Sequence, residues 1–178
     1  MAIEIRVELS HIEPLVWRKV SVPNDITLDR LHLVIQAAMG WENSHLYMFL
    51  IDDKRYEAVF DDDDFSMDDD GEDESEFRLF DLVKVGDQLQ YIYDFGDDWH
   101  HAIIVSAVND ERINAAKCDG GERACPTEDC GGPFGYLEFL AAIGDKKHPD
   151  HEHYSQWAGD FDPEVFNIEE ANSIISNL

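Results

Sequence analysis

Residues 93–101, with the sequence YDFGDDWHH, concentrate side chains that could do chemistry. Carboxylates and imidazoles bind Zn²⁺ or a similar metal, and the same groups act as general acids and bases. The strongest candidates in this stretch are Asp94, Asp97 and His101, with Trp99 between them. Whether they form a site depends on which other polar side chains the fold brings to them.

Two histidines from other segments could join this stretch. His32 lies in an expected helix that packs across the sheet, and His45 begins the strand that follows it. The resulting candidate cleft contains His32, His45, Asp94, Asp97, Trp99 and His101. The alternative is that these histidines bond to the backbone and that Trp99 belongs to the core, since His/Asp sets without fixed spacing are weak evidence for a site.

A second candidate site lies in the cysteine-containing segment CDGGERACPTEDCGGPFG, residues 118–135. A structural Zn²⁺ needs four ligands in a tetrahedron, and three thiolates with one imidazole would meet that need. The candidate ligands are Cys118, Cys125, Cys130, His148 and His151. The paired C-x₂-C signature of most zinc loops is missing, so three reduced thiols in a turn-rich loop are the competing interpretation.

The same segment raises a third kind of chemistry, nucleophilic catalysis by a cysteine. Cys130 precedes Gly131-Gly132, whose backbone N–H groups could form an anion nest. Activation would require a histidine beside the thiol. No feature of the sequence places one there, and no phosphate-binding glycine loop, G-x-S-x-G or H-E-x-x-H motif is present.

Hydrophobic periodicity indicates the elements that must position these residues. Residues 2–9 and 15–23 alternate between apolar and polar types, as half-buried strands do. Residues 27–40 change to helical spacing, with Thr27 as N-cap and Gly40 at the C-terminal end. Strands are expected at 45–51 and 55–60, and residues 93–101 form the tip of a β-hairpin.

The remaining chain contains two expected loops and the C-terminal helices. The highly acidic residues 61–76 contain no basic residue, so we expect a mobile loop there. The Gly-rich residues 118–135 predict a second loop, and helices follow, the last beginning near Asn167. The sequence therefore predicts a single α+β domain over residues 1–178. Its mostly antiparallel sheet has helices on one face and a β-β-α-β opening like that of β-grasp proteins.

Charge and composition restrict the partners. The formal net charge is −27, and such an acidic surface repels nucleic-acid phosphates, so we expect no direct nucleic-acid binding. The apolar runs are too short to cross a bilayer, and residues 1–10 lack the features of a secretory signal. We therefore expect a cytoplasmic protein.

Several segments in order resemble the plasmid pRiA4b ORF-3-like family. The matching segments are PLVWRKVSVP, LDRLHLVIQAAMGW, HLYMF, YDFGDDWHH, CPTEDCGGPFGY and HPDHEHYSQWAGDFDPEVF. One departure is Thr127, where the family pattern often has a second proline, and another is the long acidic insert. The resemblance implies a soluble intracellular fold and a link to plasmids and mobile elements, but no particular reaction.

Three functions remain open from the sequence. The first is a non-enzymatic module that binds a protein partner through an acidic surface and an aromatic and histidine-lined cleft. The second is a metal-dependent hydrolase, possible only if at least three of the hairpin-tip side chains and their histidine partners share one pocket. The third is DNA mimicry, which requires a regular stripe of acids.

Overall fold

The computed structural model describes residues 1–59 and 71–178 and has one eight-stranded sheet. The strand order is β5-β4-β3-β6-β7-β1-β2-β8, and the β4–β5 pair is parallel while the other pairs are antiparallel. The strands are β1 (Ala2–Leu9), β2 (Trp17–Pro23), β3 (Tyr47–Ile51), β4 (Lys54–Glu57), β5 (Gly71–Asp73), β6 (Gln88–Tyr93), β7 (Trp99–Asn109) and β8 (Lys117–Glu122).

Helices complete the α+β fold that the sequence predicts. They are α1 (Leu28–Met39), the 3₁₀-helix η1 (Glu74–Glu76), α2 (Leu79–Leu82), α3 (Gly132–Gly144), α4 (His151–Ala158) and α5 (Ile168–Ile175). The expected β-β-α-β opening is present, but the β6–β7 hairpin lies between β1 and β3 in the sheet. In the described part of the chain no helix is long and apolar enough to cross a membrane.

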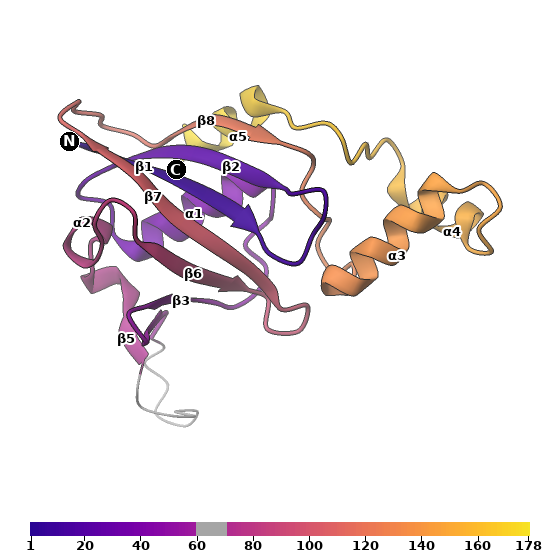
Figure 1. Ribbon diagram of the computed structural model, residues 1–178, viewed down its shortest axis with the longest axis horizontal. Coiled ribbons are helices and arrows are strands. Elements are labelled where there is room, and N and C mark those ends of the chain that lie inside the picture. The colour runs from indigo at the N-terminus through magenta and orange to yellow at the C-terminus, as the bar shows by residue number, and fades with distance from the viewer. Residues whose placement is uncertain (60–70) are drawn as a thin grey trace.

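The core lies between the sheet and α1, which covers one face (Figure 1). Alternation along β1 buries Ile3, Ile5 and Val7, and α1 contributes Leu31 and Ile35 to the same cluster. Gly40 ends α1 with a φ of 94°, a left-handed conformation that glycine adopts without steric cost. Helix α5 packs on both α1 and β8, so it closes the sheet edge at β8.

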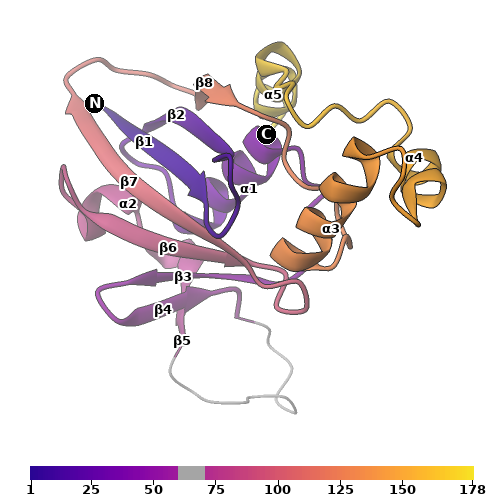
Figure 2. The same ribbon diagram turned by 45° about the vertical axis from the view of Figure 1, so that its right-hand side comes forward.

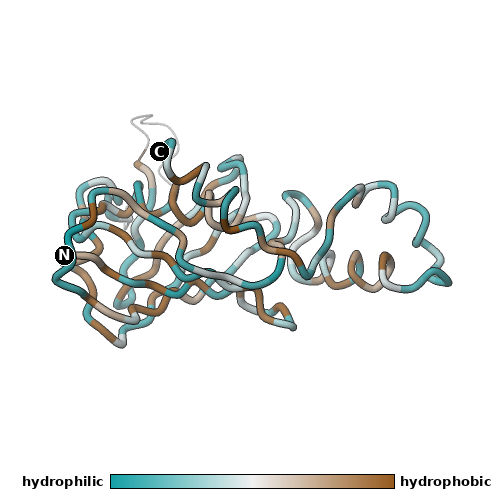
Figure 3. Tube along the Cα trace, turned by 90° about the horizontal axis from the view of Figure 1, so that it is seen from above, coloured by the Kyte–Doolittle hydropathy of each residue, from teal (hydrophilic) through white to brown (hydrophobic). Residues whose placement is uncertain are grey.

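Helices α3 and α4 form an arm that projects from the sheet on the side of the β6–β7 turn (Figures 1 and 2). Phe139 on α3 is buried and contacts the rings of Tyr154, Trp157 and Phe161. Viewed from above, hydrophobic residues gather in the sheet body and along part of α3, while the far end of the arm is hydrophilic (Figure 3). The apolar residues around Phe139 therefore extend the core of the sheet into the arm.

The structure corrects the extent of both expected loops. Residues 71–76 form β5 and η1, because Gly71–Asp73 pair with β4 and the Asp73 carboxylate caps η1. The expectation for residues 61–70 lies outside the described residues. The cysteine loop is also shorter than expected, because residues 117–122 form β8 and α3 begins at Gly132. Only residues 123–131 connect the two, and this segment is called the 123–131 loop below.

Candidate metal centre

The turn of the β6–β7 hairpin is built around Asp94. Oδ1 of Asp94 accepts hydrogen bonds from the backbone N–H groups of Gly96, at 2.9 Å, and of Asp97, at 3.3 Å. Asp94 itself has a φ of 56°, a left-handed conformation that aspartate adopts more readily than most residues. One carboxylate oxygen of Asp94 thus holds the turn, and the other, Oδ2, is available for a second role.

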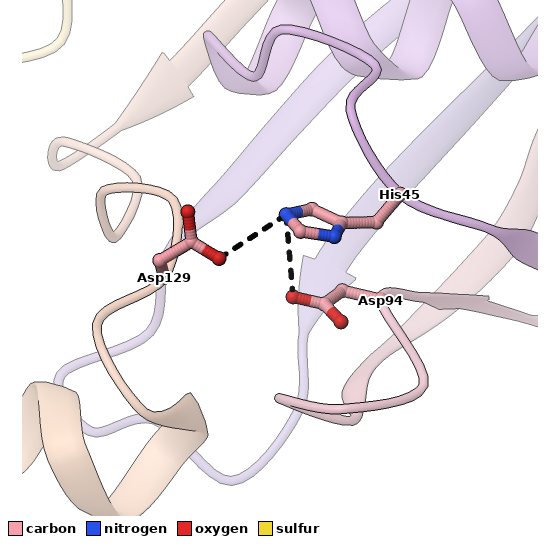
Figure 4. A group of neighbouring side chains, drawn as sticks. All are labelled: His45, Asp94 and Asp129. Atoms are coloured by element: carbon pink, nitrogen blue, oxygen red, sulfur yellow. Dashed lines mark ion pairs between the residues drawn. The ribbon is translucent and has the colours of Figure 1, made fainter.

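His45 points its Nε2 atom at three carboxylates. This atom lies 3.3 Å from Oδ1 of Asp129, 3.4 Å from Oε2 of Glu128 and 3.7 Å from Oδ2 of Asp94. Figure 4 shows His45 between Asp94, on the hairpin tip, and Asp129, on the 123–131 loop. Nε2 is buried and makes no hydrogen bond to any residue that the structure describes. His45, Asp94 and Asp129 each offer one ligand atom, and these three atoms lie within 4.8 Å of one another. We call these three residues the His45 centre.

The 123–131 loop contacts the hairpin tip directly. Oδ2 of Asp97 accepts the backbone N–H of Gly131 at 3.0 Å. A Cβ on Gly132 would lie 2.3 Å from the carbonyl oxygen of Asp97, so the two segments touch through backbone. On the other side of the loop, the indole of Trp41 donates to the Pro126 carbonyl at 2.9 Å. These contacts place Asp129 beside His45.

Glu128 is fixed beside the centre by two donors. Its Oε1 accepts from the Tyr93 hydroxyl and from the Glu42 backbone N–H, both at 2.9 Å. Burial, and then the hydrogen bond to Glu128, raise the pKa of Tyr93, so that hydroxyl stays a donor at neutral pH. The second oxygen of Glu128 faces His45, which adds a third carboxylate to the surroundings of that imidazole.

The other two predicted histidines lie in the core, away from the His45 centre. His32 bonds to the Tyr91 hydroxyl at 2.8 Å and to Oδ1 of Asn43 at 2.6 Å, and its ring stacks on Tyr47 with centroids 3.3 Å apart. Nδ1 of His101 lies 3.2 Å and 3.1 Å from two backbone carbonyls. Burial lowers the pKa of His32 to about 4 and that of His101 to about 3, so both are neutral at pH 7.

The predicted six-residue cleft is therefore only partly formed. His45 and Asp94 converge, whereas Asp97 binds the 123–131 loop and Trp99 is buried in the core. The other carboxylates around His45 belong to Glu128 and Asp129, which the sequence analysis did not select. A signal was present, because this acidic pair precedes Gly131-Gly132 within a segment that was interpreted for its thiols.

The predicted cysteine site does not come together. Cys118 is buried in β8 and its backbone is held by Asn172, while Cys125 and Cys130 follow in the 123–131 loop. Burial raises the pKa of Cys125, and it raises that of Cys130 to about 12. In residues 1–59 and 71–178, none of the side-chain groups close enough to hold a metal contains a cysteine.

The two histidines proposed as a fourth ligand lie on the arm. His148 is 3.5 Å from the Glu138 carboxylate, and Nδ1 of His151 is 2.8 Å from the Ala142 carbonyl. The reason is topological, since β8 carries Cys118 into the sheet while α3 carries the following chain outward. Glu138, His148 and Asp150 form a second, more exposed group on the arm.

Comparisons with known proteins agree over nearly the whole chain. The family described as plasmid pRiA4b ORF-3-like protein matches residues 1–170. Uncharacterized protein y4hQ of Sinorhizobium fredii (strain NBRC 101917 / NGR234) is 38% identical over 184 residues, covering 99% of this chain and 91% of that protein.

The fold is also found in a solved structure. The crystal structure of the protein of unknown function MM3350 from Methanosarcina mazei Go1 superposes with a TM-score of 0.86 at 30% identity, covering 95% of this chain and 96% of that one. The match of residues 1–170, together with the relative that is 38% identical, shows that this chain belongs to the plasmid pRiA4b ORF-3-like protein family.

Proposed function

We propose that the protein binds a divalent metal ion at the His45 centre and uses it for hydrolysis. The observation that carries the proposal is the buried Nε2 of His45. Within residues 1–59 and 71–178 this atom makes no hydrogen bond, although carboxylate oxygens surround it at 3.3–3.7 Å. Two donors that each lie ~2.1 Å from a tetrahedral Zn²⁺ are about 3.4 Å apart. The spacing at the centre therefore fits ligands around an ion better than it fits direct hydrogen bonds.

The chemistry of the ligands limits the choice of metal. One imidazole with carboxylates is a set that suits Zn²⁺ or Mn²⁺, whereas Cu⁺ and iron–sulfur clusters prefer thiolates. The side chain of Asp129 is 78% exposed, so one side of the centre is open to solvent. A water bound to the ion on that side would have a lowered pKa, which is how such metals generate a nucleophile.

The test uses protein purified without an affinity tag, stripped of metal and titrated with Zn²⁺ and Mn²⁺ by calorimetry. His45→Gln, Asp94→Asn and Asp129→Asn should each weaken binding by at least about tenfold, since each removes one ligand. Asparagine at 94 keeps an oxygen acceptor for the Gly96 N–H, so the turn should survive. His153→Gln, an exposed change on α4, is the matched control and should bind as the unaltered protein does.

Two further outcomes separate the parts of the proposal. If the unaltered protein binds neither metal, or if His45→Gln binds as well as the control, the metal centre is rejected. Loss of binding in His148→Gln instead would assign the metal to the group on the arm. Hydrolysis is then assayed on phosphate and carboxylate esters with the metal-loaded protein, and tight binding without turnover would leave a structural metal centre.

Binding of a protein partner is the second candidate function, and the arm favours it. Phe134 is 89% exposed, and Leu137 and Trp157 are also large exposed apolar residues on α3 and α4. Apolar residues grouped on a projecting element are typical of interaction surfaces. Replacing Phe134 and Trp157 with serine should abolish retention of a partner in pull-downs from native lysate, while His45→Gln should not.

A further inference from the structure

A groove of about 660 Å³ lies beside β1, β2 and β8 and shares no residue with the His45 centre. Its apolar wall includes Leu15, Trp17 and Phe166, and its polar wall includes Arg6, Arg123 and Glu164. Small-molecule sites usually have volumes of roughly 300–1,000 Å³ and combine apolar walls with a few polar groups. The groove therefore has the size and the composition of a ligand site.

Two arginines and two glutamates line this groove, so its lining is close to neutral in a chain whose net charge is −27. The guanidinium of Arg6 lies 3.9 Å from the centroid of the Trp17 ring, and that of Arg18 lies 3.8 Å from the Phe166 ring. Arg18 is only 1% exposed. A cation held in this way keeps its charge and orientation while its aromatic neighbour forms part of the groove wall.

The charge of Arg18 is not balanced by a carboxylate in the described residues. Its guanidinium donates to the backbone carbonyls of Ala38 at 2.8 Å, Trp17 at 2.8 Å and Glu122 at 3.0 Å. The Ala38 carbonyl belongs to the last turn of α1, whose partial negative charge offsets some of the buried positive charge. Phe166 lines the groove and lies between it and this guanidinium, so Arg18 positions an aromatic wall of the groove.

Arg123 offers the contact point for an anion. Its side chain is 12% exposed and Nη1 pairs with the Glu164 carboxylate. Nε is buried and has no acceptor among the described residues. A buried donor without a partner is unfavourable, so an incoming acceptor would gain from pairing with it. Glu164 is 67% exposed, so its pairing contributes little to stability and can be exchanged.

We propose that the groove binds a small organic anion, with a carboxylate or phosphate group on Arg123 and an apolar body against Leu15, Trp17 and Phe166. The anion displaces the Glu164 carboxylate, and a small rotation of the Arg123 side chain gives Nε its missing acceptor. Both anionic groups fit the planar guanidinium fork. The proposal does not depend on metal binding, because the groove and the His45 centre have no residue in common.

The experiment titrates the whole chain with phenylacetate, phenyl phosphate, inorganic phosphate and benzylamine. Binding is followed by calorimetry and by the NMR signal of the Trp17 indole N–H, which donates to Glu122 at 3.0 Å. Phenylacetate or phenyl phosphate should bind and shift this signal. Inorganic phosphate should bind at least about tenfold more weakly because it lacks the apolar body, and benzylamine should not bind.

Variants identify the contact. Arg123→Gln should weaken binding at least about tenfold, because a charge-assisted hydrogen bond is lost. Glu164→Gln should strengthen it severalfold by removing the competing carboxylate, a gain that a misfolded variant would not show. Arg112→Gln, at a different concavity, is the control and should change nothing. The proposal fails if neither aromatic anion binds, if benzylamine or inorganic phosphate binds equally well, or if Arg123→Gln and Glu164→Gln behave like the control.

Discussion

The hairpin tip and the cysteine segment 118–135 were two separate candidate metal sites in the sequence, and in the structure they differ in the type of ligand that each can offer. The tip contributes Asp94 to a group that also contains His45. The loop contributes Asp129 to that same group, while its thiols, Cys125 and Cys130, are turned toward the interior. The two candidate sites therefore meet where the hairpin tip contacts the 123–131 loop, a contact that we call the junction. Only the carboxylates of the loop point toward His45 there.

Burial explains the difference between the thiols and the carboxylates. A metal ligand must be deprotonated, and burial in apolar surroundings disfavours the thiolate. Burial raises the pKa of Cys125, Cys130 and Cys118, and the positive charge of Arg18 lowers those of Cys118 and Cys125 less than burial raises them. The Asp129 carboxylate, by contrast, lies at the rim, where its side chain is 78% exposed to water. Position relative to the core therefore decides which of the neighbouring donors can hold an ion.

The largest expected effect concerns the reactivity of the thiols. With a pKa of about 12, Cys130 is thiolate for roughly one part in 10⁴ at pH 8, against about a quarter for a free cysteine. Labelling with a disulfide reagent should therefore be about a thousandfold slower in the native protein than in urea. It should also increase with pH up to pH 9 without reaching a plateau. Absorbance of the released thiolate measures the rate.

Rapid labelling of one cysteine in the native protein would contradict this explanation. If a cysteine in the native protein reacts at a rate close to that in urea, it is accessible and ionised, and the thiols become candidate ligands again. Cys125→Ser and Cys130→Ser would identify which thiol is responsible.

The next effect tests whether the tip and the loop form one junction. Gly132 has a φ of 67°, and a Cβ there would meet the Asp97 carbonyl oxygen at 2.3 Å. Gly132→Ala should reduce the free energy of unfolding by about 3 kcal/mol, combining left-handed strain with overpacking. It should also weaken metal binding, because the loop that carries Asp129 must move away from Asp94. Urea unfolding and calorimetry measure the two effects.

Gly144→Ala is the matched control at the other end of α3. Gly144 has no positive φ, and no atom lies within 4 Å of the position its Cβ would take. Alanine there should leave the stability unchanged or raise it by up to about 1 kcal/mol. Equal losses in the two variants would mean that the contact between Gly132 and Asp97 does not hold the junction together.

Local signals predicted much of the fold. Alternation along residues 2–9 predicted β1, helical spacing predicted α1, and the expected hairpin tip at 93–101 is the turn between β6 and β7. Asn167 was expected to begin the last helix, and its side chain caps α5 by accepting the Glu170 N–H at 3.1 Å. These elements were predictable because the residues that determine them are near one another in the sequence.

The candidate centre was less predictable because it joins three distant segments. His45 and Asp94 were selected by residue type and by the turn, but Asp129 meets them only through the contact of the loop with Asp97. His101 shares a face with the buried Ile103 and Val105, and that alternation already indicated a core residue. Exposure of individual donors is set by tertiary packing, which residue type and spacing alone did not reveal.

The smallest expected effect distinguishes the two sides of the junction directly. Cys125→Ser exchanges a buried thiol for a hydroxyl and should cost about 1 kcal/mol of stability, because the hydroxyl is harder to bury. It should leave the metal content of the protein unchanged, since Cys125 is not part of the His45 centre. Asp129→Asn, four residues further on, should lower the metal content while leaving stability within about 0.5 kcal/mol, because this side chain is exposed. Metal analysis and urea unfolding give the metal content and the stability of each variant.

Release of metal by Cys125→Ser, with retention in Asp129→Asn, would reverse the assignment. It would show that the thiols of the loop, rather than its carboxylates, hold the ion.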